Sequence, residues 1–186
     1  MLTDPEHRDI IAFAIGTLLR EGEIFCRQWT EVDFVGSAIH VGDSKNGEGR
    51  SVALAPWVLG LLRRQKARAG KSPWVWPSPT DPSRPRNSHN FKGRIFRKYL
   101  KQAGIVDFRW HDLRHTGASR LVMATGDLYA VGELMGHKTP RMTKRYSHLS
   151  PLHQQRLVGT LVDPLKNLEP ESKPEPQKVD REELKI

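Results

Sequence analysis

The sequence has a single cysteine, Cys26, so no disulfide bond can form within the chain. It has no run of 18 apolar residues and no basic-then-apolar signal peptide at its N-terminus. Disulfide-rich secreted proteins and membrane-spanning proteins are therefore poor matches to this chain. We expect a reduced, cytoplasmic setting without membrane contact, and we expect Cys26 to be a small residue of the hydrophobic core.

Acidic residues are in the minority, with 21 aspartates and glutamates against 30 lysines and arginines, for a formal net charge of +9. A surplus of this size attracts polyanions, and nucleic acid is the most common of them. Charge alone fits a merely soluble basic protein equally well. With 186 residues, 37% of them hydrophobic and 27% charged, the chain has the composition of one globular domain with an apolar core.

The C-terminal segment differs from the rest of the chain. Residues 164–186 include Pro170, Pro174 and Pro176, contain no aromatic residue, and carry five basic and six acidic side chains. Residues 1–163 therefore hold a net charge of +10, so the basic surplus belongs to the globular part. We expect residues 164–186 to be a tail that is flexible or docks on a partner.

Helices dominate the prediction for the globular part. Asp4-Pro5, Thr139-Pro140 and Ser150-Pro151 each place a capping side chain before a proline suited to the first helical position. Glycines at 104, 126 and 136 stand where helix C-caps are expected. Besides the helix that begins at Pro5, we expect helices at about 23–29, 56–68, 88–103, 111–125 and 127–135.

Two short segments, about 34–41 and 50–54, read as β-strands joined by a turn that contains Asn46-Gly47. Asn-Gly between alternating apolar residues is a strong signal for a β-hairpin. Residues 72–87 are rich in proline and read as a loop. The predicted fold class is α+β, mostly α-helical, with a small antiparallel β-sheet.

The first motif with chemical content is His111-Asp112-Leu113-Arg114. His111 and Arg114 are three residues apart at a helix start, so their side chains share one face. A helix start also presents unpaired backbone N–H groups that suit a phosphate. His-x-x-Arg is nevertheless a weak signal alone, because such pairs are common by chance.

A second group lies around Tyr146, which follows His137 by nine residues. Taken alone, Tyr146 would be a half-buried aromatic with a satisfied hydroxyl. Its sequence neighbours are unusually basic for that role, and they are Arg141, Lys144, Arg145 and His148. Arg20, after an apolar helix, and Lys45, at the tip of the hairpin, are two further candidates that alone would be ordinary exposed charges.

Taken in order, these residues resemble the catalytic signature of the tyrosine recombinases, and the resemblance runs from about residue 8 to about 162. The matching set is Arg20 with Glu23, Lys45 on the hairpin, His111-x-x-Arg114, Gly136-His137 and Tyr146. Within the family, His-Asp-Leu-Arg-His-Thr and Leu-Met-Gly-His look most like phage-type and bacterial integrases. One departure is Thr17-Leu18-Leu19-Arg20, where the family usually has Thr-Gly-Leu-Arg.

The resemblance implies that Tyr146 attacks a DNA phosphate and forms a 3′-phosphotyrosyl intermediate. Arg20 and Arg114 would grip the non-bridging oxygens, and Lys45 would protonate the departing 5′-oxygen. The remaining roles go to His111 (accepting the tyrosine proton or holding the phosphate), His137 (a hydrogen bond to the phosphate) and Glu23 (orienting its neighbours). No cofactor is expected, and the histidines lack a carboxylate or cysteine partner at metal-ligand spacing.

The resemblance also implies partners. Residues 1–163 would be a catalytic domain that acts on double-stranded DNA and self-associates into a tetramer there, with the C-terminal segment as a candidate docking element. Family members carry a core-binding domain before this one, so we expect the chain to be part of a longer recombinase. Three alternatives stay open: a catalytically silent DNA-binding domain, a type IB topoisomerase-like relaxation enzyme, and a basic structural or ribosome-associated protein.

Overall fold

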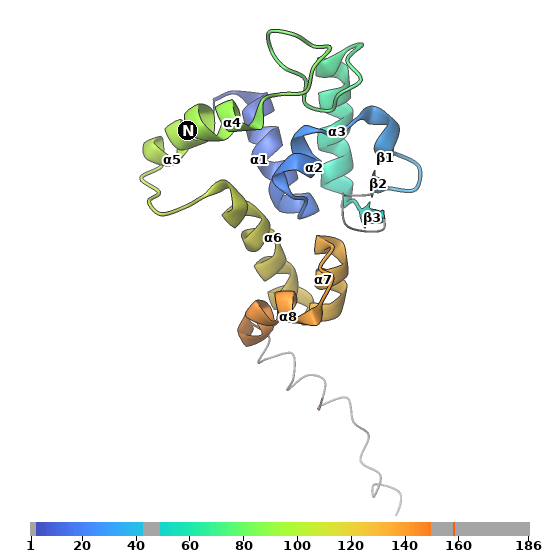
Figure 1. Ribbon diagram of the computed structural model, residues 1–186, viewed down its shortest axis with the longest axis vertical. Helices are drawn as coiled ribbons and strands as arrows, with labels where there is room; N and C mark the ends of the chain where they lie inside the picture. The colour runs from blue at the N-terminus through green and yellow to red at the C-terminus, as the bar shows by residue number, and fades with distance from the viewer. Residues whose placement is uncertain (1–2, 43–48, 150–157, 159–186) are drawn as a thin grey trace, which may run out of the picture.

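The computed structural model describes residues 3–42, 49–149 and 158. This part of the chain is mostly helical and holds one three-stranded antiparallel sheet, so the predicted α+β class is confirmed (Figure 1). The α-helices are α1 (Pro5–Thr17), α2 (Glu21–Phe25), α3 (Pro56–Ala69), α4 (Ser88–Asn90), α5 (Arg97–Gln102), α6 (Trp110–Thr125), α7 (Leu128–Met135) and α8 (Pro140–Thr143). Two 3₁₀ segments, Trp29–Glu31 and Lys144–Leu149, and a π-helical segment, Phe91–Phe96, complete the helical part.

Helix α1 begins as its sequence predicts. The Asp4 side chain accepts hydrogen bonds from the backbone N–H groups of Glu6 (2.8 Å) and His7 (3.1 Å), and Pro5 occupies the first turn. The helix buries Ile10 and Phe13 completely and packs against both α3 and α6. This double contact fixes the C-terminal end of α1, which leads into Arg20, against α6.

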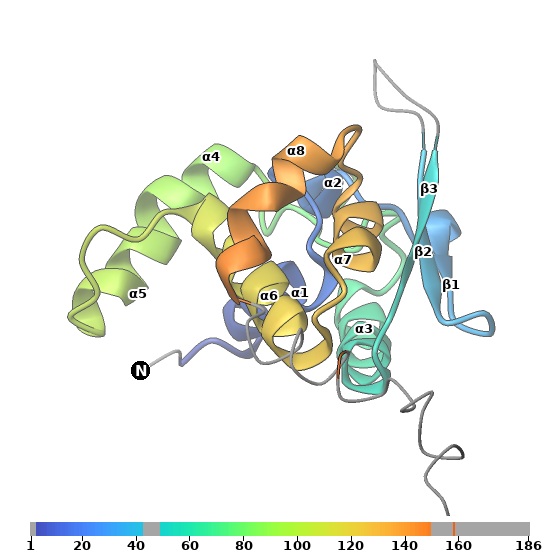
Figure 2. The same cartoon turned by 90° about the horizontal axis from the view of Figure 1, so that it is seen from below.

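The sheet has strand order β1 (Val32–Asp33), β2 (Ala38–Val41), β3 (Arg50–Ala53). In the β2–β3 pair Ile39 lies opposite Val52, and both are buried, whereas the neighbouring pair His40 and Ser51 is exposed. The predicted hairpin strands are therefore present, with one face toward the core. Figure 2 shows the two strands side by side, and β3 contacts α7. Lys45 lies outside the described residues.

Two predictions around α2 are wrong. The helix expected over 23–29 ends at Phe25, because the chain then turns to pair Gln28 with Trp74 in a β-bridge. Arg27, just beyond the helix, is buried and donates to the carbonyl of His40 on β2 (2.8 Å). Cys26 was expected in the core, but it caps α2 and is exposed. Both outcomes come from tertiary contacts that are invisible in the local sequence.

The hydrophobic core has two parts joined by α6. The larger part gathers α1, the sheet and α3 around Phe13, Trp76 and Phe91, and it includes Leu113 of α6. The smaller part contains Leu18, Ala118, Val122, Val131, Met135 and Tyr146. Helix α6 lies so close to α1 that a Cβ at Gly117 would come within 2.3 Å of the Ile15 carbonyl oxygen. Within the described residues, no helix combines the length and the apolar character needed to span a bilayer.

Candidate active site

The predicted site residues that the structure describes converge on one small cavity. The cavity has a volume of about 150 Å³ and lies where the end of α1, α6, α7 and the segment after α8 meet. Its lining residues are Arg20, His111, Arg114, His115, Met135, His137, Met142, Arg145 and Tyr146. Glu23 lies beside this cavity, in contact with Arg20. Five of the six residues predicted to be catalytic are thus brought together, and the sixth, Lys45, is not described.

Arg20 follows a sharp turn at the end of α1. Leu18 adopts the left-handed conformation at φ +55°, and Arg20 then begins α2 as its N-cap. The guanidinium donates to the carbonyl of Gly136 (2.9 Å) and to the Glu23 carboxylate (3.2 Å). The Arg20 side chain remains 42% exposed, so it is held from behind while its outer edge stays accessible.

Glu23 holds two arginines in place. Its carboxylate accepts from the backbone N–H of Arg20 (2.7 Å) and accepts a two-pronged pair of hydrogen bonds from Arg50 (2.9 Å each). Burial alone would raise the pKa of Glu23, but the hydrogen bonds from Arg50 and from the Arg20 backbone outweigh it and lower the pKa to about 2. Glu23 is therefore ionised, and its carboxylate bonds to both Arg20 and Arg50.

Arg50 was missed by the sequence reasoning, although it begins β3, the second strand of the hairpin whose predicted tip carries Lys45. Besides Glu23 it contacts the end of α7, where its Nε lies 3.4 Å from the Leu134 carbonyl oxygen. The position of Arg50 also explains why residue 136 is a glycine. Its backbone has φ +62°, and a Cβ there would lie only 2.9 Å from the Arg50 guanidinium carbon.

Arg114 is buried at the floor of the cavity. Its guanidinium donates to the carbonyl of Leu18, at the end of α1, and to that of Met135, at the end of α7 (2.5 Å). Burial, followed by the charge of Arg20, lowers the pKa of Arg114 to about 10, so the group stays charged at neutral pH. Two carbonyls from different helices thus fix the direction of this cation.

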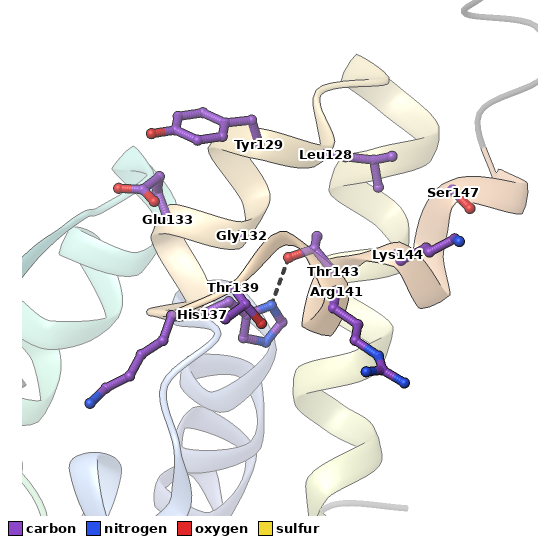
Figure 3. Close-up of a pocket in the computed structure, with 11 residues that line it drawn as sticks. Leu128, Tyr129, Gly132, Glu133, His137, Thr139, Arg141, Thr143, Lys144 and Ser147 are labelled. Carbon is purple, nitrogen blue, oxygen red and sulfur yellow. Dashed lines mark hydrogen bonds between the residues drawn. The ribbon is translucent and has the colours of Figure 1, made fainter. Parts of the chain in front are cut away.

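The surroundings of His137 and His111 disfavour the protonated form of both rings. Nδ1 of His137 is 2.8 Å from the Thr143 hydroxyl (Figure 3). Burial and the charges of Arg114 and Arg20 lower the pKa of His137 to about 4. The pKa of His111 is also lowered, first by burial and then by Arg114. A neutral imidazole keeps one donor and one acceptor nitrogen, which suits both hydrogen bonding and proton transfer.

Tyr146 lies with its ring in the smaller core cluster and its hydroxyl at the cavity. The side chain is only 3% exposed. Its hydroxyl oxygen is 2.5 Å from Nδ1 of His115, a residue that the sequence reasoning did not single out. Burial raises the pKa of Tyr146, while the charges of Arg145 and Arg114 oppose that rise, so the group is a neutral phenol.

The signal that could have revealed His115 is its place on α6. Residues 111, 114, 115, 118 and 122 share one helical face, so His115 must point the same way as Arg114. Arg145, which the sequence analysis named only as a basic neighbour of the tyrosine, has its Nη1 3.5 Å from Nε2 of His115.

The lining of the cavity is strongly cationic. Within the described residues it contains three arginines and three histidines, and no carboxylate. Such a cavity is suited to a small anion, above all to a phosphate whose oxygens can accept several fixed N–H donors. No group of three or more potential metal ligands was found among the residues that the structure describes.

A buried tyrosine beside clustered arginines and histidines, on this mostly helical fold, is the arrangement that the sequence led us to expect of a tyrosine recombinase. The sequence model of the phage integrase family matches residues 3–153, which is most of the chain. The chain belongs to the phage integrase family.

Relatives of known identity agree. The integrase of Salmonella phage P22 is 34% identical over 156 residues, which cover 78% of this chain and 40% of that protein. The tyrosine recombinase XerA of Pyrococcus furiosus is 24% identical over 152 residues, covering 81% of this chain and 53% of XerA. The chain thus spans about half or less of the length of these two relatives.

Solved structures show the same fold. The integrase of transposon Tn1549, in complex with circular-intermediate DNA, has a TM-score of 0.68 at 19% identity and covers 84% of this chain and 61% of that one. The catalytic domain of bacteriophage HP1 integrase has a TM-score of 0.60 at 23% identity, covering 82% of this chain and 80% of that domain.

Proposed function

We propose that this chain cleaves and rejoins double-stranded DNA through a 3′-phosphotyrosyl intermediate, in site-specific recombination or DNA integration. The observation that carries the proposal is the Tyr146 hydroxyl, which lies at a cavity lined by arginines and neutral histidines. A phosphate in that cavity would face a nucleophile on one side and fixed cations on the others.

Arg20 and Arg114 act on the two non-bridging oxygens. The phosphorane-like transition state carries more negative charge there than the ground state does, so donors fixed in advance stabilise it selectively. Both guanidiniums are anchored by protein carbonyls: Gly136 for Arg20, and Leu18 and Met135 for Arg114. His111 and His137 add hydrogen bonds to the phosphate, because each neutral ring has a donor nitrogen.

Tyr146 bonds to phosphorus as the bond from phosphorus to the 5′-oxygen breaks. Lys45 protonates that leaving oxygen, which departs as a 5′-hydroxyl. In rejoining, the 5′-hydroxyl attacks the phosphotyrosine and the same groups work in reverse. The phosphotyrosyl bond conserves the energy of the phosphodiester, so the mechanism requires neither ATP nor a divalent metal.

Several observations support DNA as the partner. Residues 1–163 carry a net charge of +10, which suits contacts with several phosphates. The structurally similar Tn1549 integrase and XerH recombinase were both solved with DNA. Acting on cellular or phage DNA would place the chain in the cytoplasm, as the sequence predicts. Residues 1–163 would form the catalytic domain of a longer recombinase, with 164–186 as its tail.

We also propose that the chain assembles as a tetramer on DNA. A second hollow, of about 570 Å³, lies between α7 and the segment that follows α8, close to His137 (Figure 3). Leu128 and Tyr129 line it, and Tyr129 is 75% exposed. Residues 150–163, which lie outside the described residues except for Val158, follow directly and are rich in leucine and valine. Val158 is 65% exposed, which favours docking of this segment in the hollow of a neighbouring copy.

Covalent capture tests the proposed function. The chain is incubated with a labelled pool of nicked duplexes of random sequence, from which the short cleaved strand diffuses away so that the adduct accumulates. Wild type should form an adduct that survives denaturing electrophoresis. Tyr146→Phe should form none but should still bind DNA, because it loses only the hydroxyl.

The same assay separates the alternatives. A silent DNA-binding domain would bind the pool and form no adduct. A relaxation enzyme would form the adduct and relax a supercoiled plasmid without exchanging strands between two duplexes. A basic structural protein would make no adduct, and an adduct that persists in Tyr146→Phe would remove Tyr146 as the nucleophile.

A further inference from the structure

The Tyr146 hydroxyl already has a hydrogen-bond partner, and that partner is neither His111 nor His137, the two histidines to which the resemblance gives a role. Nδ1 of His115 lies 2.5 Å from the phenolic oxygen. His111 packs against the His115 ring in a T-shaped arrangement, with 4.7 Å between ring centroids. The Nδ1 atom of His137 is engaged with Thr143. Among the three histidines of the cavity, His115 is thus the one in contact with the nucleophile.

We propose that His115 takes the proton from Tyr146 when the tyrosine attacks the scissile phosphate. This inference rests on the proposed strand-transfer function and adds an acceptor for the tyrosine proton, a role that the resemblance offered to His111. His111 is then left to hold the phosphate. As the bond from the tyrosine oxygen to phosphorus forms, the O–H bond breaks and its proton moves to Nδ1 of His115. The leaving 5′-oxygen receives a different proton, from Lys45. On rejoining, the imidazolium of His115 returns its proton to the tyrosine oxygen.

The surroundings of His115 keep it ready to accept. Burial lowers its pKa first, and the neighbouring His111 and Arg145 lower it further, so the ring is neutral at neutral pH. A DNA phosphate in the cavity would add negative charge beside these cations and raise the pKa of the ring. His115 would therefore become a better base at the moment when a substrate is present.

Within the described residues, the charged and titratable groups that face His115 come from three parts of the chain. On α6 they are His111, Asp112 and Arg114, and on the segment after α8 they are Arg145 and Tyr146. His137, which follows α7, is the third. Asp112 raises the pKa of His115 and opposes the cations. The guanidinium of Arg145, 3.5 Å from Nε2, disfavours a lasting imidazolium. That repulsion favours return of the proton during rejoining, so one residue can serve both directions.

The first test is His115→Asn. The asparagine amide can reproduce a hydrogen bond near the Nδ1 position but cannot accept a proton. The matched control is His40→Asn, on the exposed side of β2 and away from the cavity. The substrate is a nicked duplex from the pool that forms the adduct with wild type. On this duplex, His115→Asn should form the adduct roughly 10²-fold or more slowly than wild type, because a general base usually contributes that much. His40→Asn should match wild type.

A second measurement distinguishes the base from the acid. In a duplex whose scissile 5′-oxygen is replaced by sulfur, the leaving group is a thiolate, whose conjugate acid has a pKa of roughly 8.5 in cysteine. This substrate has little need of an acid, so it should rescue Lys45→Ala. It should not rescue His115→Asn, because the tyrosine proton must still be removed.

A third measurement uses added bases. His115→Ala should regain activity in the presence of imidazole, and the regain should increase with the pKa of substituted imidazoles. A residue that only packs against the tyrosine would show no such dependence. This variant also keeps the proposal testable if His115→Asn fails to fold.

The outcomes separate two failures. If wild type forms adduct and His115→Asn forms it equally fast or faster, His115 only restrains the tyrosine by a hydrogen bond, and the proposal is overturned. Rescue of His115→Asn by the sulfur substrate would overturn it as well. If wild type itself forms no adduct with any duplex in the pool, the proposed function fails first, and this inference falls with it.

Discussion

At the scale of single residues, Leu18 shows how the chain departs from its family and keeps the site. The family usually has glycine at this position, and glycine enters the left-handed region freely. Leu18 adopts φ +55° all the same, and its carbonyl accepts a hydrogen bond from Arg114. Its side chain is 2% exposed and packs in the cluster that contains Tyr146. Burial thus offsets the backbone strain, and the turn before Arg20 survives.

This balance between burial and backbone strain predicts that glycine is tolerated better than alanine at position 18, the reverse of the usual order in a helix. Leu18→Gly and Leu18→Ala both lose the buried side chain, at a cost of roughly 2–5 kcal/mol. Only the glycine variant also relieves the left-handed strain, which is worth roughly 1–2 kcal/mol. We expect Leu18→Gly to be more stable than Leu18→Ala by about 1 kcal/mol in urea unfolding.

Leu121 provides the control, since it lies inside α6 and is partly exposed. There, Leu121→Ala should be more stable than Leu121→Gly, the usual order in a helix. The same order at both positions would contradict the account of the turn.

At the scale of elements, the ion pair between Glu23 and Arg50 links α2 to β3 of the hairpin. The pair joins the start of α2 to the start of β3, and Arg50 reaches on to the end of α7. Three elements around the cavity therefore depend on one carboxylate. This explains why a residue outside the cavity can control the placement of Arg20 inside it.

The low pKa of Glu23 predicts a pH-dependent loss of stability. The folded-state pKa is about 2 against an ordinary 4.5. The ionised carboxylate therefore stabilises the fold fully above about pH 4.5, and this contribution is lost as the pH falls toward 2. Glu23→Gln should lower the free energy of unfolding at pH 7 by about 3 kcal/mol. Its deficit relative to wild type should shrink steadily between pH 4.5 and pH 2.

Denaturant unfolding across this pH range measures the effect. Glu133→Gln, which removes an exposed carboxylate on α7, is the matched control for the loss of one surface charge. A constant deficit for Glu23→Gln at all these pH values would mean that the carboxylate does not titrate with the fold.

At the scale of the whole molecule, we propose that residues 150–163 pack on a neighbouring copy. Deleting residues 150–186 should weaken cooperative assembly on a DNA with paired sites more than it lowers the melting temperature, if this segment docks on a neighbour. Deleting only residues 164–186 is the control, and it should leave assembly largely intact. The melting temperature and the assembly on DNA with paired sites, followed by native gel electrophoresis, are measured for the intact chain and for the two deletions. A large fall in melting temperature after the longer deletion would place the segment in the same copy's core instead.

The sequence by itself determined most of the helices and strands and most of the residues that line the site. Asp4-Pro5 fixed the start of α1, and the alternating segments around Asn46-Gly47 fixed two strands, because capping, strand alternation and turn formation depend on near neighbours. The ordered motifs identified Arg20, His111, Arg114, His137 and Tyr146, which do line one cavity. Lys45 and the C-terminal tail remain predictions, because they lie outside the described residues.

Only the tertiary structure decided the partners of these residues. Arg114 is anchored by Leu18, 96 positions away, Glu23 by Arg50, 27 positions away, and Tyr146 meets His115 across 31 positions. The end of α2 and the exposure of Cys26 were decided in the same way, by contacts between distant segments. Local spacing shows which face a side chain shares, but it carries no information on which distant group will lie within hydrogen-bond distance of that face.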